Sequence, residues 1–322
     1  MDFLLHDPQI GEEMRLIEAK LLRSAHSREP VTRQAVEELI RGGGKRLRPL
    51  MLLLSAKNGE YDKEEICSVA AALEIVHMAT LVHDDIIDDS VLRRGSETVQ
   101  SKWGKDIAVF TGDYLLCTFF LLIPPRYRIR DLQKWMRVIK TVCEGEIRQY
   151  HDRYKPDITV RGYLKRIAAK TAVLFSLNCY VGASCAKCGQ QIVHALSKFG
   201  MNMGMAFQIT DDILDFTGKS SEMGKPASND FTQGVYTLPI IYALRHSEYG
   251  EKLRNMLSKR QYTKDEEDQI THMVFQAGGI GYAKKLARQY VERARKHVNG
   301  LPAGASRNAM NALLEQVANR VV

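Results

Sequence analysis

The sequence has few cysteines and no long apolar run. Its six cysteines are scattered over 322 residues, and only Cys185 and Cys188 form a CxxC pair. A zinc site would need a second pair at a suitable spacing, so we expect free thiols in a reducing compartment. The longest apolar run, residues 115–123, is too short to span a bilayer, and the N-terminus lacks the basic start of a signal peptide. We therefore expect a soluble, cytoplasmic protein without a transmembrane segment.

The chain also lacks a Pro/Gly/Ser-rich linker and any sustained run of charge. With 322 residues and 45% hydrophobic content it can bury a large core. Segments with a 3.6-residue apolar period outnumber alternating patterns, and they cover 64–90, 131–150, 161–185, 190–217, 230–246 and 281–299. Breaks are expected at 58–62, 124–129, 218–229 and 247–250. The pattern predicts a single all-α domain over residues 1–322, built as a helical bundle around a central cleft.

The net charge of +8 comes from dispersed basic residues. No platform of alternating aromatic and basic residues, such as RNA-binding domains use, accompanies them. We therefore expect no nucleic-acid partner.

One acidic cluster occurs in the stretch LVHDDIIDDSVLRRG, residues 81–95. On a helix, Asp84 and Asp88 lie about 40° apart and one turn from each other, so one face carries both carboxylates. Like charges at this spacing destabilise a helix unless a cation lies between them. The same stripe carries His77 and Thr80 one to two turns earlier. Taken alone, the cluster could also be a solvated acidic helix end.

A second copy of the spacing favours a metal site. In MGMAFQITDDILDF, residues 203–216, Gln208, Asp211 and Asp215 share a face, and the preceding residues are apolar or small. Carboxylate oxygens from two helices suit Mg²⁺, which is usually completed by substrate phosphates, whereas neither stretch has a calcium-binding EF-hand loop. Asp85 and Asp212 point about 100° away from their neighbours, so we expect them to act indirectly or through water.

Basic residues suited to a phosphate precede the first acidic cluster. The stretch RGGGKRLRPL, residues 41–50, places Lys45, Arg46 and Arg48 behind three glycines, which let backbone and cations approach a phosphate closely. It is not a P-loop, because the GxxxxGK[ST] spacing is absent. Together the acids and bases indicate a polyphosphorylated ligand.

These motifs carry a family resemblance. In order along the chain they are GGGKRLRP, H-x6-DDxxD-x4-RRG, Lys170–Thr171, FQxxDDxLD and GKP followed by Asp230. Together they resemble the trans-polyprenyl diphosphate synthases, which have the isoprenoid synthase fold. The stretches CEGEIRQY, YLKRIAAKTA and YTLPIIYAL are most similar to the catalytic large subunits of two-component bacterial hexaprenyl and heptaprenyl diphosphate synthases. The resemblance implies a prenyltransferase that adds isopentenyl diphosphate to an allylic diphosphate.

The same resemblance implies a role for each motif residue. About three Mg²⁺ ions per active site would be held, directly or through water, by Asp84, Asp85, Asp88, Asp211, Asp212 and Asp215. The allylic diphosphate would bind Arg93, Lys170 and Lys225, and isopentenyl diphosphate would bind Lys45, Arg48, His77 and Arg94. Thr171 and Gln208 would stabilise the allylic cation. The groups expected to be catalytic are Asp84, Asp88, Asp211, Lys170, Thr171 and Gln208.

Product length in this family depends on residues just before the first acidic motif. Here Val76, Ala79 and Thr80 form the expected wall, and the small side chains at 79 and 80 predict an open tunnel. We expect a product longer than C20, of about C30 to C35 by subgroup likeness, for the side chain of a quinone. Further floor candidates are Leu73, Phe119, Phe120 and Met203. The segments FTQGVYTLP and GASCAKCG depart from the family pattern and leave product length less determined than the reaction.

Alternatives remain open at this stage. A homodimeric synthase with a shorter geranylgeranyl product, or with an octaprenyl or longer product, would carry the same motifs. A class I terpene cyclase would share the first acidic motif but not the second, and a non-catalytic subunit would lose the aspartates. The partner is therefore expected to be a second copy of the chain or a small non-catalytic subunit. A long apolar product would be compatible with transient membrane contact.

Overall fold

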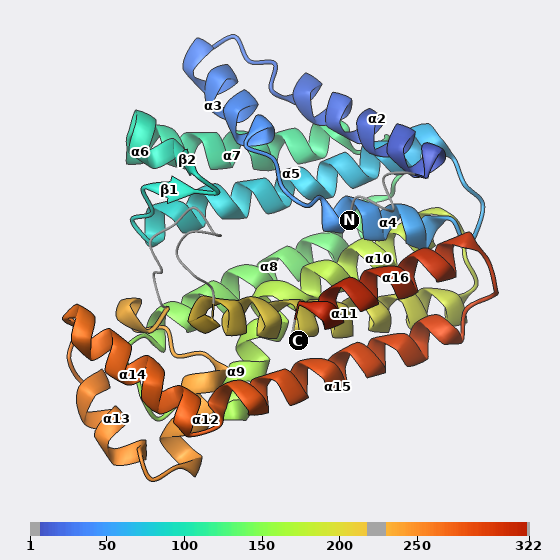
Figure 1. The fold of residues 1–322 in the computed structure, drawn as a ribbon. Helices are drawn as coiled ribbons and strands as arrows, with labels where there is room; N and C mark the ends of the chain where they lie inside the picture. The colour runs from blue at the N-terminus through green and yellow to red at the C-terminus, as the bar shows by residue number, and fades with distance from the viewer. Residues whose placement is uncertain (1–6, 218–229, 321–322) are drawn as a thin grey trace. The chain divides into compact units, whose positions relative to one another are not determined.

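The structure, a computed structural model, describes residues 7–217 and 230–320, and these fold almost entirely as helices (Figure 1). The all-α prediction is confirmed. Within the described ranges the strands are β1 (Leu92–Arg93) and β2 (Ser96–Glu97), which pair antiparallel. Arg94 and Gly95 join them with φ angles of 53° and 81°. Positive φ at both loop positions is typical of a type I′ hairpin turn, so the RRG motif folds as a tight hairpin that the sequence analysis did not predict.

The chain divides into two compact units. The first comprises Met1–Gln133, Asn178–Leu196 and Pro302–Met310. Its complete helices are α2 (Pro8–Ser24), α3 (Pro30–Arg41), α4 (Leu47–Ala56), α5 (Lys63–Ile87), α6 (Val99–Trp103) and α7 (Lys105–Leu122). Helix α5 packs against α2, α4 and α7, and Figure 1 shows it running alongside α7. It is the central helix of this unit.

The sequence of α5 explains its central position. The helix starts at the N-cap Asp62, whose carboxylate accepts a hydrogen bond from the backbone N–H of Glu65 at 3.0 Å. Residues 63–65 form its polar first turn, and most residues from 66 to 82 are apolar and buried, as expected for a core helix. The acidic motif follows at the other end, where Asp88 is the C-cap. The fold therefore brings the first acidic motif to the end of a core helix.

The second unit comprises Lys134–Leu177, Ser197–Leu301 and Asn311–Val322. It holds all or part of α8 (Ile129–His151), α9 (Val160–Ile167), η1 (Ala168–Ala172), α10 (Val173–Cys185), α11 (Gln190–Thr217), η2 (Asp230–Gln233), α12 (Leu238–His246), α13 (Gly250–Leu257), α14 (Lys264–Gln276), α15 (Gly279–Asn299) and α16 (Ala305–Asn319). Helix α12 contacts α9, α13, α14 and α15, and its apolar side chains join a buried cluster with those of α11.

The predicted helical segments agree with the structure except in two places. The segment 161–185 contains η1, a π-helical turn over Ala168–Ala172, and the segment 230–246 is divided into η2 and α12. Thr237 is the extended N-cap of α12, and Pro239 lies in the first turn of that helix, where its missing N–H breaks no intrahelical hydrogen bond, so a new helix begins here. The predicted break at 218–229 lies outside the described residues, and the single domain stays a prediction.

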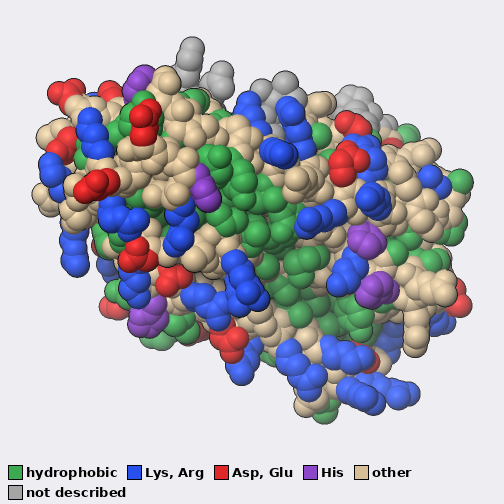
Figure 2. Space-filling model, turned by 90° about the horizontal axis from the view of Figure 1, so that it is seen from below, with side chains coloured by type: hydrophobic (Ala, Val, Ile, Leu, Met, Phe, Trp, Pro, Cys, Tyr) green, Lys and Arg blue, Asp and Glu red, His purple; other side chains and the backbone are tan. Residues whose placement is uncertain are grey.

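Two described helical segments are long and apolar enough to cross a membrane, namely Lys63–Ile87 and Val160–Cys185. Within the structure 72% and 61% of their apolar windows are buried, as in the core helices of soluble proteins. Figure 2 shows one face of the molecule, on which Lys and Arg side chains lie in several separate groups. On this face the positive charge is dispersed, as the sequence analysis assumed.

Candidate functional site

The first acidic motif lies at the carboxyl end of α5. Asp84 and Asp88 are half-buried one turn apart, and the N–H of Asp88 donates to the carbonyl of Asp84 at 2.9 Å. The last turn of α5 holds no basic residue. Because the carboxyl end of a helix carries partial negative charge, two aspartates there are doubly unfavourable until a cation binds. The fold thus brings both carboxylates of the motif to one helix end, and their binding of a metal ion stays a prediction.

Asp85 differs from its neighbours because it is buried and bound to an arginine. Arg93, in β1, donates from Nε to both carboxylate oxygens at 2.9 Å, and its Nη2 lies 2.8 Å from Oδ1. Both oxygens of Asp85 are therefore used by Arg93. This agrees with the indirect role expected from its direction on the helix, and it fixes Arg93 beside the motif.

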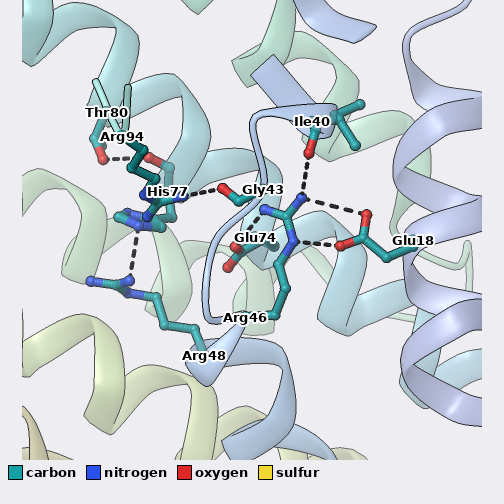
Figure 3. Close-up of polar contacts among 9 residues, drawn as sticks. All are labelled: Glu18, Ile40, Gly43, Arg46, Arg48, Glu74, His77, Thr80 and Arg94. Carbon is teal, nitrogen blue, oxygen red and sulfur yellow. Dashed lines mark hydrogen bonds and ion pairs between the residues drawn. The ribbon is translucent and has the colours of Figure 1, made fainter. Parts of the chain in front are cut away.

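The basic loop before α4 contains one cation that points inward. Arg46 is buried, has φ +43°, and serves as the N-cap of α4. Its guanidinium donates to Glu18 at 2.6 Å, to Glu74 at 3.1 Å and to the carbonyl of Ile40 at 2.9 Å (Figure 3). Arg46 lies in the same basic stretch as Lys45 and Arg48 but was not among the residues expected to bind a diphosphate. Its contacts fix the loop against α2 and α5.

His77 lies at the centre of a cationic group. Its Nε2 is 2.8 Å from Nη1 of Arg48, and Arg94 donates to the carbonyl of Gly43 nearby (Figure 3). Burial lowers the pKa of His77 well below its usual value, and the positive charges of Arg48 and Arg94 lower it further. The imidazole is therefore neutral at pH 7.

A cavity of about 470 Å³ opens beside these residues. Its lining includes His77, Arg93 and Arg94 together with the apolar residues Met78, Leu81, Val99 and Trp103. It suits a small molecule with an anionic head and a short apolar body. Lys45, also predicted for this ligand, lines a different hollow beside α2 instead.

The second acidic motif lies in the last two turns of α11. Asp211 is paired with Arg320 at 3.4 Å, and Asp215 accepts a hydrogen bond from the N–H of Asp230 at 2.9 Å. Burial raises the pKa of Asp215 to about 8, and the negative charge of Asp230 adds to the shift. Asp230 was noted in the sequence only as part of the GKP motif. It belongs to this acidic cluster.

Asp212 is buried beneath the cluster and receives two hydrogen bonds. Tyr163 donates to its Oδ2 at 2.6 Å, and Gln208 donates from Nε2 to its Oδ1 at 2.8 Å. Burial raises the pKa of Asp212 to about 7, and Asp230 adds to the shift, although both hydrogen bonds oppose it. Tyr163 was missed because nothing in the sequence distinguishes it from other core tyrosines.

Lys170 and Thr171 lie in the π-helical turn η1. Lys170 pairs with Glu146 at 2.7 Å, and Thr171 donates to Oε1 of Gln208 at 2.7 Å. A π turn inside an α-helix is often found at functional sites, because it redirects one or two side chains. Lys225, the remaining predicted cation, lies outside the described residues.

The structure shows where the residues of the predicted product wall lie but does not test their role. Val76 and Ala79 are buried on α5, and the hydroxyl of half-buried Thr80 donates to the carbonyl of His77 at 2.8 Å. Phe120, a predicted floor residue, is 52% exposed, so its side chain does not close a buried channel within this chain. The wall residues stay predictions.

In neither unit, among the residues that the structure describes, do three His, Cys, Asp or Glu side chains converge on a common point. The two acidic motifs offer carboxylate oxygens, which are the donors that a hard cation such as Mg²⁺ prefers.

Comparison with known proteins gives a consistent picture. A family model described as polyprenyl synthetase matches residues 29–274. The heptaprenyl diphosphate synthase component 2 of Geobacillus stearothermophilus is 38% identical over 97% of this chain and 97% of that protein.

Two solved structures superpose on this chain. The heptaprenyl diphosphate synthase from Staphylococcus aureus is 33% identical with a TM-score of 0.91, covering 97% of this chain and 99% of that one. The geranylgeranyl pyrophosphate synthase from Lactobacillus brevis ATCC 367 is also 33% identical with a TM-score of 0.91, covering 98% of both chains. Because the two names specify different product lengths, the fold alone does not decide product length.

Proposed function

The chain belongs to the polyprenyl synthetase family and is a prenyltransferase, and from that premise we propose that it extends an allylic diphosphate with isopentenyl diphosphate to about C30 to C35. The observation that carries the proposal is the pair of acidic motifs at the carboxyl ends of α5 and α11. In an enzyme that acts on diphosphates, cations bound at the two motifs would neutralise the substrate's negative charge. In a purely structural helix, such clustered carboxylates would only be destabilising. Farnesyl diphosphate is the expected starter, and a quinone side chain the expected use.

The family is generally Mg²⁺-dependent, and the carboxylates fit that ion. Asp84 and Asp88 would hold Mg²⁺ in the first unit, and Asp211 and Asp215 in the second, with about three ions in total once substrate oxygens complete them. Bound Mg²⁺ would supply Lewis-acid stabilisation of the departing pyrophosphate. Asp85 and Asp212 would not bind it directly, because their oxygens already accept hydrogen bonds.

The cationic residues would hold the two diphosphates. His77 and Arg94 line the half-apolar cavity, so we assign isopentenyl diphosphate to it. Arg48, which contacts His77, and Lys45, which lines a different hollow, are the further candidates for the same diphosphate. Arg93 and Lys170, each held by a carboxylate, would bind the allylic diphosphate, together with Lys225.

The reaction would form one carbon–carbon bond in each cycle. The allylic carbon–oxygen bond breaks to give pyrophosphate and an allylic cation. The double bond of isopentenyl diphosphate attacks that cation, and loss of a proton to the departing pyrophosphate restores a double bond. Oxygen atoms of Thr171 and Gln208 would stabilise the cation.

Product length and partner rest on the relatives. The name of the Geobacillus relative specifies a heptaprenyl product and a second component, so we infer a C35-like product and a heterodimer with a small non-catalytic subunit. A homodimer is the competing arrangement, and a geranylgeranyl or octaprenyl product the competing length. We place the enzyme in the cytoplasm, with membrane contact limited to product release.

The experiment is an incubation of the purified chain with Mg²⁺, farnesyl diphosphate and labelled isopentenyl diphosphate, with and without lysate of the source organism. Extracted products are sized by reversed-phase chromatography. Product from the chain alone indicates a homo-oligomer, and product only with lysate indicates a missing subunit. Asp84→Ala is the matched control, and its turnover should fall by orders of magnitude with the helical circular dichroism unchanged. No product under either condition would contradict the proposed function.

A further inference from the structure

Three hydrogen bonds form a relay that links Tyr163, Asp212, Gln208 and Thr171 in the second unit, and its donors point toward Asp212 from both ends. Tyr163 Oη donates to Oδ2 of Asp212 at 2.6 Å, Gln208 Nε2 donates to Oδ1 of Asp212 at 2.8 Å, and Thr171 Oγ1 donates to Oε1 of Gln208 at 2.7 Å. Tyr163, Asp212 and Thr171 are buried, so water does not readily replace these bonds.

Asp212 determines which groups donate and which accept in this hydrogen-bond relay. Both oxygens of Asp212 accept a hydrogen bond, one from the Tyr163 hydroxyl and one from the Gln208 NH₂ group, so the Gln208 amide turns its NH₂ group toward Asp212. The amide oxygen of Gln208 then faces Thr171, and the hydroxyl must give its single hydrogen to that oxygen. What remains on Thr171 and on the Gln208 oxygen is acceptor capacity alone.

We propose that Asp212 and Tyr163 are positioning residues that orient the Gln208 amide and the Thr171 hydroxyl so that both present oxygen lone pairs to the allylic cation. The inference rests on the proposed function, because it requires an electron-poor reacting carbon. Without Asp212 the amide could rotate by half a turn and present N–H hydrogens, which repel a cation. The second aspartate of the motif thus orients neighbouring residues and is not a metal ligand.

The packing of α11 against η1 holds the residues of the relay close together and in fixed positions. A Cβ atom on Gly204 would lie 2.6 Å from Cα of Ala172, so only glycine lets α11 approach η1 this closely. Gln208 lies one turn after Gly204 on the same helix, and Asp212 one turn further. Because preorganised dipoles stabilise developing charge most when they need no reorientation, such a rigid arrangement is useful to the chemistry.

The test compares Asp212→Leu with the matched control Asp211→Leu over a Mg²⁺ titration in the prenyl-transfer assay. We expect Asp212→Leu to lower kcat about 100-fold, with the KM of both diphosphates and the half-maximal Mg²⁺ concentration within about threefold of wild type. Asp211→Leu should raise the Mg²⁺ requirement. Recovery of Asp212→Leu at high Mg²⁺ would identify Asp212 as a metal ligand and overturn the proposal.

A double-mutant cycle tests the connection to Thr171. Tyr163→Phe removes one hydroxyl and keeps the ring in the core, so it serves even where Asp212→Leu impairs folding. We expect it to lower kcat about tenfold alone, but by less than about threefold in a Thr171→Val background, because residues that act as a unit are not additive. If the kcat loss of the double variant equals the product of the losses caused by Tyr163→Phe and Thr171→Val alone, the two residues act independently and the relay is contradicted.

The proposal and the proposed function fail in different ways. A wild-type chain that makes no product, with or without lysate, contradicts the function, and the relay with it. An active wild type whose kcat is unchanged by Tyr163→Phe and Asp212→Leu contradicts the relay alone.

Discussion

Nη1 of Arg48 lies 2.8 Å from Nε2 of His77. A guanidinium has only hydrogens to donate, so the imidazole must accept, and it can do so only while that nitrogen is unprotonated. The pair therefore depends on a neutral His77, which is the form that burial and the neighbouring arginines favour.

His77 should make the protein less stable in acid. Its pKa is lowered in the folded chain, whereas an unfolded histidine titrates near about 6.5, so below that pH the unfolded state binds more protons. We expect this group to remove up to about 1.4 kcal/mol of unfolding free energy per pH unit below about 6.5. His77→Gln should flatten the slope in urea titrations, and exposed His272→Gln should retain it. Equal slopes for His77→Gln and wild type would contradict the assignment.

The acidic cluster on α11 should destabilise the metal-free protein in base. The pKa of Asp215 is raised to about 8, above its unfolded value of about 3.9, so the folded state binds more protons and stability falls as the pH rises between these values. In EDTA, Asp215→Asn should have a higher Tm than wild type at pH 8, with a smaller difference at pH 5. Added Mg²⁺ should narrow the difference at pH 8. A difference independent of pH would argue against the cluster.

Removing Arg46 should destabilise the first unit. Its loss leaves the buried carboxylate of Glu74 unpaired, which typically costs about 3–5 kcal/mol. Arg46→Met should lower the urea midpoint accordingly, and the double change Arg46→Met with Glu74→Gln should recover part of the loss. Arg41→Met, on the exposed end of α3, is the control and should change stability by less than about 0.5 kcal/mol.

Enlarging Thr80 should shorten the product. Thr80→Phe places a bulky ring at the expected tunnel wall, and Thr80→Ser keeps both the small volume and the hydroxyl. Reversed-phase sizing should show shorter chains for the first variant and wild-type chains for the second. An unchanged length with Thr80→Phe would mean that the channel passes elsewhere.

Much of the helical fold was predictable from periodicity, because long amphipathic or fully apolar segments have few alternatives. The directions of Asp85 and Asp212 also followed from helix geometry. The inward position of Arg46 did not, since it depends on Glu18, 28 residues away, and on a backbone φ of +43°. The π turn at Lys170 and the role of Tyr163 depend on packing between distant segments, which a local pattern does not contain.

The hydroxyl of Thr80 holds the carbonyl of His77, so one turn of α5 serves two purposes. A substitution chosen there to change product length also alters His77, which lines the cavity that we propose for isopentenyl diphosphate. Attempts to engineer chain length at this position should therefore shift the affinity for isopentenyl diphosphate at the same time, and variants that alter one property alone must be sought on another helix.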